Sequence, residues 1–163
     1  MKPRFNYAKA APGTYVAMEA LDEYLEQCSL EPTLLHLVRL RASQINGCAY
    51  CIDMHWKDLR ALGEDEQRLY MLSVWRECQY YYTARERAAL AWTEVVTAIS
   101  RGVPDELYED VRPHFTEKEL ADLTLGIATI NAWNRLSISA GLIPGGYRSG
   151  LKPRTEVSVV LEA

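Results

Sequence analysis

The chain has 163 residues, of which 48% are hydrophobic and 25% are charged, which is the composition and length of an ordinary single-domain globular protein. Eighteen Lys and Arg against 22 Asp and Glu give a net charge of −4 with the signs interspersed, which argues against a nucleic-acid-binding surface. No apolar run is long enough to predict a signal peptide or a membrane span, so we expect a cytoplasmic protein that does not bind membranes.

Apolar residues with helical spacing organise the first part of the chain. Residues 15–28 carry one apolar stripe and predict the first helix. Residues 32–45 predict a second helix, and its apolar residues on several sides are typical of a central helix. A third helix is predicted over residues 48–62, with a glycine directly after it as its C-terminal cap.

Two capping boxes mark the helices of the second half. After a short segment at residues 69–75, the box Thr-Ala-Arg-Glu at 83–86 opens a long helix. Residues 105–111 predict a short helix, and the box Thr-Glu-Lys-Glu at 116–119 opens the last one. The sequence therefore predicts an all-α fold with about six helices.

We expect the whole chain, residues 1–163, to form one domain with its core at about residues 15–143. Residues 144–163 predict an irregular C-terminal tail, because glycines and prolines break the helical pattern there. The apolar segment 157–161 near the end of this tail is expected to pack on its own domain or on a neighbouring subunit.

Two cysteines and a histidine share one face of the third predicted helix. Cys51 follows Cys48 by three residues and His55 follows Cys51 by four, and a rotation of about 100° per residue brings all three together. The unpaired amides and the dipole at a helix start stabilise a thiolate, and a nearby imidazole can relay a proton. This pattern predicts a redox dithiol, in which one thiolate attacks and the other resolves the product as a disulfide.

A zinc site is an alternative interpretation of the same residues. Cys48, Cys51 and His55 would be three ligands, and His36 or Cys78 would complete a tetrahedron. The spacing lacks the second ligand pair that makes zinc motifs specific, so we predict no bound metal. Two buried structural cysteines beside a hydrogen-bonded histidine are a further alternative.

Two segments resemble a known family. Residues 37–55, Leu-Val-Arg-Leu-Arg-Ala-Ser-Gln-Ile-Asn-Gly-Cys-Ala-Tyr-Cys-Ile-Asp-Met-His, closely resemble the core of the AhpD-like alkylhydroperoxidases of the carboxymuconolactone decarboxylase superfamily. Residues 130–136, Ile-Asn-Ala-Trp-Asn-Arg-Leu, resemble the last-helix signature of that group. The resemblance implies an all-helical subunit that assembles as a homotrimer or homohexamer. It also implies a thiol peroxidase that reduces hydrogen peroxide and organic hydroperoxides, with no bound cofactor and with electrons from a dihydrolipoyl protein.

The resemblance also implies roles for individual residues. Cys51 would be the peroxidatic thiol, Cys48 its resolving partner and His55 part of the proton relay. The glutamate of the family's relay falls on His36, which can accept a proton but cannot supply a fixed negative charge. A structural hydrogen bond is the other interpretation of His36. The helix dipole favours Cys48 as the more acidic thiol, so the order of attack stays open.

Several other residues are weaker candidates. Asp53 or Glu19 would orient an imidazole if either lies within hydrogen-bond reach. The three tyrosines at 80–82 are candidates for lining a peroxide pocket, although such clusters more often belong to a core or a subunit contact. Cys28 and Cys78 are interpreted as small buried hydrophobic residues.

Two other functions remain as alternatives to a peroxidase. A carboxymuconolactone-type decarboxylase needs acid and base groups, and a pair of thiols is an odd way to bind a carboxylated lactone. A redox-sensing or thiol–disulfide exchange protein would use the same dithiol without peroxidase turnover.

Overall fold

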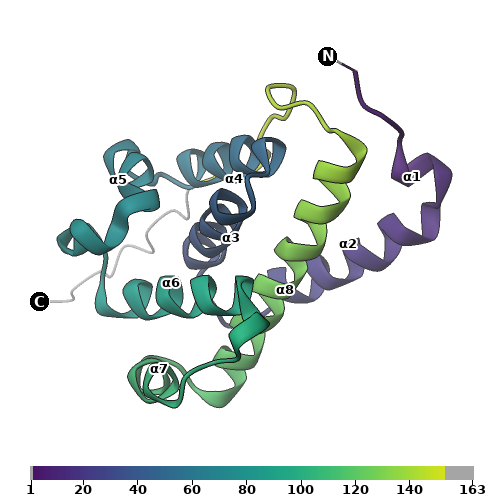
Figure 1. Ribbon diagram of the computed structural model, residues 1–163. Coiled ribbons are helices and arrows are strands. Elements are labelled where there is room, and N and C mark those ends of the chain that lie inside the picture. The colour runs from purple at the N-terminus through teal and green to yellow at the C-terminus, as the bar shows by residue number, and fades with distance from the viewer. Residues whose placement is uncertain (1, 153–163) are drawn as a thin grey trace, which may run out of the picture.

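The structure is a computed structural model that describes residues 2–152, and helices with no strands make up its regular structure (Figure 1). The predicted all-α class is confirmed. The α-helices of the described residues are α1 (Tyr7–Ala10), α2 (Pro12–Glu26), α3 (Pro32–Asn46), α4 (Ala49–Ala61), α5 (Glu66–Met71), α6 (Ala84–Thr97), α7 (Asp105–Val111) and α8 (Glu117–Ala140). Short 3-10 helices are η1 (Leu72–Glu77), η2 (Gln79–Tyr81), η3 (Ile99–Arg101) and η4 (Arg112–His114).

Helix α3 is the centre of the fold, as its apolar sequence predicts. It packs against α4, α6 and α8, and Figure 1 shows it between α4 and α6. Leu37, Val38 and Leu40 have no more than a trace of exposed surface. Val38 belongs to an apolar cluster with α6 and α8, whereas Leu37 and Leu40 belong to a second cluster with α4, α5 and η1. Burial of these side chains on both sides of α3 provides the main driving force for folding.

Two short helices are absent from the sequence prediction. Helix α1 has four residues, buries none of them and is capped by the Asn6 side chain, which accepts a hydrogen bond from the Lys9 amide at 3.0 Å. Helix α5 has six residues and is capped by Asp65, which accepts from the Gln67 amide at 2.8 Å. Neither is long enough to show an apolar period. The first long helix, α2, also begins at Pro12, three residues earlier than expected.

Both capping boxes are confirmed. The Thr83 side chain accepts from the Glu86 amide while the Glu86 carboxylate accepts from the Thr83 amide, and Thr116 and Glu119 repeat this exchange. Each pair satisfies two amides that have no partner inside the helix. These boxes fix where α6 and α8 begin, and α8 is one of the helices that pack on α3.

The chain beyond α8 lies against α4. Gly141 ends α8 with a φ of 69°, and residues 142–152 form no helix. The Gly145 amide donates to Asp53 Oδ2 at 2.9 Å, and the Tyr147 hydroxyl donates to Asp58 Oδ1 at 2.8 Å. These contacts bring the segment to the middle of α4. The apolar residues 157–161 lie outside the described part of the chain.

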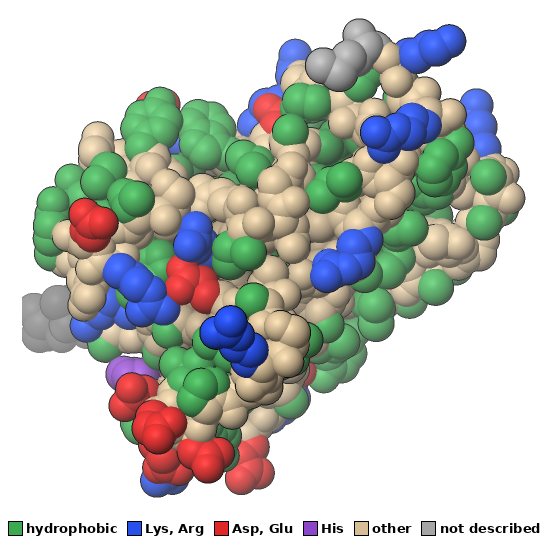
Figure 2. Space-filling model, in the orientation of Figure 1, with side chains coloured by type: hydrophobic (Ala, Val, Ile, Leu, Met, Phe, Trp, Pro, Cys, Tyr) green, Lys and Arg blue, Asp and Glu red, His purple; other side chains and the backbone are tan. Residues whose placement is uncertain are grey.

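The surface carries two distinct features on the face shown in Figure 2. Acidic side chains gather over α7, where Asp105, Glu106, Glu109 and Asp110 are exposed. Hydrophobic side chains gather near the α5 end of the same face. Within residues 2–152, no helix combines the length and apolar character needed to cross a membrane.

Candidate functional site: a dithiol beside paired imidazoles

Cys48 and Cys51 lie at the start of α4 and are joined by a disulfide, with their Cα atoms 5.4 Å apart. Cys48 is the N-cap residue, and Cys51 is in the first turn. Each is about 1% exposed, and they pack in a small apolar cluster with Ala42 and Ile130. The predicted position of the pair at a helix N-terminus is therefore correct.

The turn that presents the cysteines is fixed by polar contacts. The Cys48 amide donates to the Ser43 carbonyl at 3.0 Å. The Asn46 side chain donates to Asn131 at 2.9 Å and to Asn134 at 2.8 Å, both on α8. Both asparagines of the 130–136 segment thus hold the turn between α3 and α4 in place.

No side chain caps α4, so the positive end of its dipole faces the sulfur-bearing residue at the N-cap. An N-cap side chain is positioned to accept hydrogen bonds from the first-turn amides. In the reduced protein, a Cys48 thiolate would occupy that position.

A cavity of about 360 Å³ lies beside the dithiol, between α2, α3, α4, α8 and the segment after α8. Cys51 lines this cavity, whereas Cys48 is not among its lining residues. Cys51, His55 and His36 line it together, so the structure brings three of the predicted site residues to one space. Its outer walls include acidic and aromatic side chains: Tyr7, Tyr15, Glu19, Glu23 and Trp133. A small molecule that entered the cavity would therefore meet Cys51 before Cys48.

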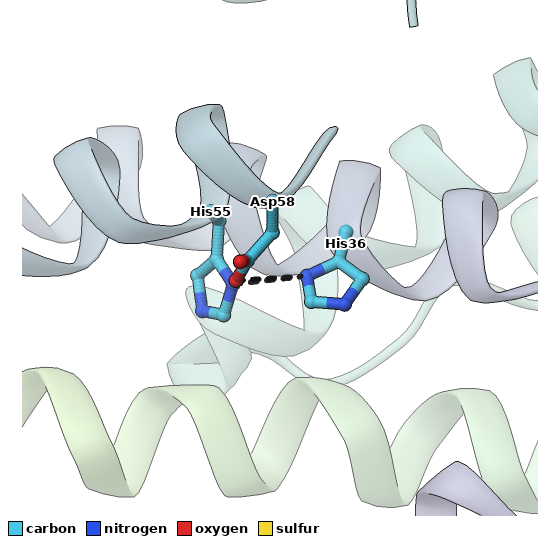
Figure 3. A group of neighbouring side chains, drawn as sticks. All are labelled: His36, His55 and Asp58. Carbon is cyan, nitrogen blue, oxygen red and sulfur yellow. Dashed lines mark hydrogen bonds and ion pairs between the residues drawn. The ribbon is translucent and has the colours of Figure 1, made fainter. Parts of the chain in front are cut away.

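Two histidines and an aspartate form a buried cluster in this cavity (Figure 3). His36 comes from α3, and His55 and Asp58 are three residues apart on α4. The Nδ1 atoms of His36 and His55 are 3.2 Å apart. Oδ2 of Asp58 is 3.6 Å from Nδ1 of His36 and 3.8 Å from Nδ1 of His55. Three polar atoms thus face one another, and a proton on either Nδ1 makes the contact between the rings a hydrogen bond.

Both imidazoles are held in the neutral form. Burial, with a smaller contribution from the positive charge of Arg39, lowers the pKa of His36 to about 3. Burial, together with His36 and Arg39, lowers the pKa of His55 well below its usual value. The contacts of the two rings with Asp58 are therefore not ion pairs, and at 3.6 and 3.8 Å they are too long for hydrogen bonds.

The outer polar atoms of the cluster differ in whether they have a hydrogen-bond partner. Asp58 Oδ1 accepts the hydrogen bond from the Tyr147 hydroxyl, whereas Nε2 of His55 is buried and has no hydrogen-bond partner among the described residues. Burial and the bond to Asp58 raise the pKa of Tyr147 to about 12, so its hydroxyl stays protonated as the donor. A neutral imidazole with an unpartnered nitrogen can accept or pass on a proton.

Asp58 and Tyr147 are the site residues that the sequence analysis missed. Asp58 follows His55 by three residues, so helical spacing alone places it on the face of the histidine. Asp53, which was considered instead, binds Lys57 at 2.8 Å and the Gly145 amide, and so holds the C-terminal segment rather than an imidazole. Tyr147 carried no sequence signal, because it lies in a stretch without periodicity.

Other candidates lie away from the cavity. Cys78 is buried in the second apolar cluster, and its thiol is 3.5 Å from the Val74 carbonyl, so the zinc set completed by Cys78 is not formed. Cys28 is half-buried rather than buried. Of the three tyrosines, Tyr80 is 80% exposed and Tyr82 is buried in the second cluster, and the idea that they line the site is wrong.

Residues 12–95 match the model of the carboxymuconolactone decarboxylase family, and this match covers the dithiol and both histidines. The chain belongs to this family. It is similar to the uncharacterized protein YdfG of Bacillus subtilis, with 46% identity over 142 residues that cover 86% of this chain and 96% of YdfG.

Solved structures place the chain among the AhpD-like members of this family. A protein of unknown function from Agrobacterium tumefaciens, named as a candidate antioxidant defence protein AhpD, is 44% identical with a TM-score of 0.85, and the alignment covers 90% of this chain and 100% of that one. A peroxidase-related protein from Silicibacter is 25% identical with a TM-score of 0.76, over 93% and 81% of the two chains. The debrominase Bmp8 shares the fold at 16% identity with a TM-score of 0.75, over 85% and 74%. The resemblance seen in the sequence is thereby confirmed.

Proposed function

We propose that this protein is a thiol peroxidase that reduces hydrogen peroxide or organic hydroperoxides by cycling Cys48 and Cys51 between dithiol and disulfide. The observation that carries the proposal is the cysteine pair at the N-terminus of α4, with Cys51 and His55 lining one cavity. Membership in a family with peroxidase-related, AhpD-like members supports it.

The first step is attack of the Cys51 thiolate on the outer oxygen of a hydroperoxide. The O–O bond breaks, Cys51 becomes a sulfenic acid, and the leaving oxygen takes a proton to form an alcohol or water. Cys48 then attacks the Cys51 sulfur, which forms the disulfide and releases water. An external dithiol reduces the disulfide by thiol–disulfide exchange and is itself oxidised to a disulfide.

We infer different tasks for the two cysteines from their positions. Cys51 lines the cavity and attacks, although Cys48 has the better position for a stable thiolate at the N-cap. Stabilisation at the N-cap suits a resolving thiol, because a low pKa also makes Cys48 a good leaving group when the disulfide is reduced. This assignment agrees with the roles that the family resemblance implies.

His55 is the residue that moves the proton. It lies one helical turn after Cys51, is neutral, and has an unpartnered Nε2 that can accept the thiol proton and return it to the leaving oxygen. His36 contacts Nδ1 of His55 and is the second member of this relay. The reductant is an external dithiol of the dihydrolipoyl class, and the subunits assemble as homotrimers or homohexamers. No bound cofactor takes part in the cycle.

The test is peroxide consumption by purified protein in the presence of a metal chelator, with dihydrolipoamide as the reductant. We expect many turnovers per subunit, and we expect Cys48→Ser and Cys51→Ser to abolish them. Cys28→Ser is the matched control, since Cys28 lies outside the cavity. Trapping of a sulfenic acid with dimedone in Cys48→Ser, but not in Cys51→Ser, identifies the attacking sulfur.

Two results would count against the proposal. If the disulfide forms and is reduced without multiple turnovers of peroxide, the protein is a redox sensor or a thiol–disulfide exchange partner. If the wild type and both serine variants release CO₂ equally from a carboxylated lactone and none consumes peroxide, it is a decarboxylase.

A further inference from the structure

We propose that Nδ1 of His36, Nδ1 of His55 and Oδ2 of Asp58 bind one divalent transition-metal ion, with Zn²⁺ as the reference cation. This site differs from the cysteine-based zinc site considered from the sequence, because it keeps His36 and His55 as ligands but uses Asp58 in place of the two cysteines. It goes beyond the proposed peroxidase function and does not require it.

The three separations fit ligands of a shared ion, and only the one between the two Nδ1 atoms also fits a hydrogen bond. The separations are 3.2, 3.6 and 3.8 Å. Ligands held about 2.0–2.1 Å from a tetrahedral zinc ion lie about 3.3–3.4 Å from one another. The two longer separations exceed any hydrogen bond, so the carboxylate oxygen faces two nitrogens without bonding to either. Figure 3 shows the two rings and the carboxylate turned toward a common point.

The chemistry of the three groups also suits a transition metal. Imidazole nitrogens and carboxylate oxygens are common ligands of transition metals, and both Nδ1 atoms lie within 3.8 Å of Oδ2 of Asp58. Two nitrogens and one carboxylate oxygen favour Zn²⁺, Co²⁺ or Fe²⁺ over Mg²⁺ and Ca²⁺, which prefer oxygen ligands. The side chains of His36, His55 and Asp58 are 13%, 5% and 4% exposed, so water competes poorly for them.

The surroundings hold the carboxylate and leave a coordination position free. The Tyr147 hydroxyl donates to Asp58 Oδ1 at 2.8 Å and leaves Oδ2 for the ion. Such outer hydrogen bonds orient metal ligands and raise affinity. Because the three residues line the cavity, a fourth position of the ion can face it, as in zinc sites with three protein ligands.

Metal binding has a consequence for the proton relay, and this step rests on the proposed function. An ion on Nδ1 of His55 fixes the ring proton on Nε2, so that nitrogen can no longer accept a proton. Bound Zn²⁺ should therefore slow peroxide turnover, and a chelator should restore it.

The test of the site itself is metal binding to the oxidised, disulfide-bonded protein, so that Cys48 and Cys51 are not available as ligands. Metal-free protein is titrated with Zn²⁺ by calorimetry and with Co²⁺ by visible absorption. We expect one ion per subunit and cobalt bands of a nitrogen- and oxygen-ligated site, without thiolate-to-cobalt charge transfer. Neither readout depends on peroxidase activity, so this test and the peroxidase test can fail separately.

The variants that test the ligands are Asp58→Asn and His36→Gln, and His114→Gln is the matched control because His114 lies on η4 outside the cavity. We expect the two ligand variants to weaken Zn²⁺ binding at least tenfold and the control to leave it unchanged. Circular dichroism verifies that each variant is folded. The cobalt spectrum of the wild type remains decisive if a ligand variant does not fold.

Three results would overturn the metal site. The first is the absence of saturable Zn²⁺ or Co²⁺ binding to the wild type. The second is binding that folded Asp58→Asn and His36→Gln leave unchanged. The third is a cobalt spectrum dominated by thiolate charge transfer, which would place the ion on Cys28 or Cys78.

Discussion

At the scale of single residues, His36 is one of two positions, with Tyr50 between the cysteines, where this chain departs from the pattern of the family it resembles. Its Nδ1 lies 3.2 Å from Nδ1 of His55, so it occupies the place from which a glutamate would support a positive charge on that ring. A neutral histidine can pass a proton but cannot provide this support.

We therefore expect His36→Glu to reduce peroxide at least as fast as the wild type in a chelator-containing assay. The added carboxylate would stabilise the imidazolium that forms on His55 during proton transfer. His36→Gln is the control, because it has a similar length and no charge, and it should give no gain. A large loss of rate in the glutamate variant would show that the imidazole at position 36 has a role of its own.

Tyr147 provides a second prediction at this scale. Its hydroxyl is a donor to Asp58, whose side chain is 4% exposed. We expect Tyr147→Phe to lower the free energy of unfolding by about 1.5 kcal/mol, because a buried carboxylate loses a hydrogen bond. Urea denaturation measures the loss. Tyr70→Phe is the control at an exposed site. An equal loss of unfolding free energy there would mean that the buried contact with Asp58 stabilises the protein no more than an exposed tyrosine hydroxyl does.

The sequence was enough to group the candidate site residues but not to find the residues that hold them. Cys48, Cys51 and His55 share a face because their spacing is helical, so one helix was enough to group them. His36 was placed beside them by resemblance. Tyr147 reaches Asp58 from 89 residues away through an irregular segment, and no local pattern reports such a contact.

At the scale of elements, the junction of α3 and α4 sets the position of the dithiol. Gly47 ends α3 with a φ of 69°, and Cys48 follows as the N-cap of α4. A Cβ at position 47 would meet no atom within 4 Å, so a larger residue there costs only the energy of a left-handed backbone.

We expect Gly47→Ala to lower the free energy of unfolding by about 1 kcal/mol, measured by urea denaturation of the reduced protein. Gly47→Asn should lose less, since asparagine tolerates the left-handed region. Gly13→Ala, within α2 and also with open space around it, is the control and should not destabilise. Similar losses at positions 13 and 47 would contradict the backbone explanation.

Glu94 ties three elements together and predicts a pH dependence of stability. On α6, it accepts hydrogen bonds from Arg41 of α3 and from Trp75 and Arg76 of η1. Burial alone would raise the pKa of Glu94, but these hydrogen bonds outweigh it and lower the pKa below its usual value. The unfolded chain therefore binds this proton at a higher pH than the folded one.

The stabilisation from Glu94 is thus fully present above the unfolded pKa of about 4.5 and is lost as the pH falls through the lower folded pKa. We expect the wild type to exceed Glu94→Gln in unfolding free energy at pH 7, and the difference to shrink below pH 4.5. Glu109→Gln removes an exposed pair with Arg112 and should show little difference at either pH. A gap for Glu94→Gln that stays constant below pH 4.5 would disprove the linkage.

The long helices were predictable and the short ones were not, for a physical reason. Helices α3, α6 and α8 each bury a face, and burial requires apolar spacing that is visible in the sequence. Helix α1 buries no residue and is held by one side-chain cap, so its sequence shows no helical spacing of apolar residues. The irregular segment after α8 was expected from its glycines, whereas its contacts with α4 were not.

At the scale of the whole molecule, the exposed hydrophobic side chains bear on the assembly that the family resemblance predicts. Exposed Tyr70, Val74 and Tyr80 lie on the consecutive elements α5, η1 and η2, and hydrophobic side chains gather near the α5 end in Figure 2. We expect sedimentation equilibrium to give three or six times the subunit mass of 18.5 kDa. A mass that stays at one subunit at micromolar concentration would contradict this expectation.

The groups assigned to chemistry lie within residues 36–58, a single helical hairpin of α3 and α4. The hairpin forms one side of the cavity, and the other walls come from α1, α2, α8 and the segment after it. Substitutions in those walls can change which molecule fits without moving a reacting atom. The hairpin is in this sense a transferable chemical unit, and its substrate preference can change through wall residues of α1 and α2, whereas α8 also holds the dithiol turn through Asn131 and Asn134. Replacing the wall residues of α2 and α8 with those of another family member is the direct way to change which substrate the cavity accepts.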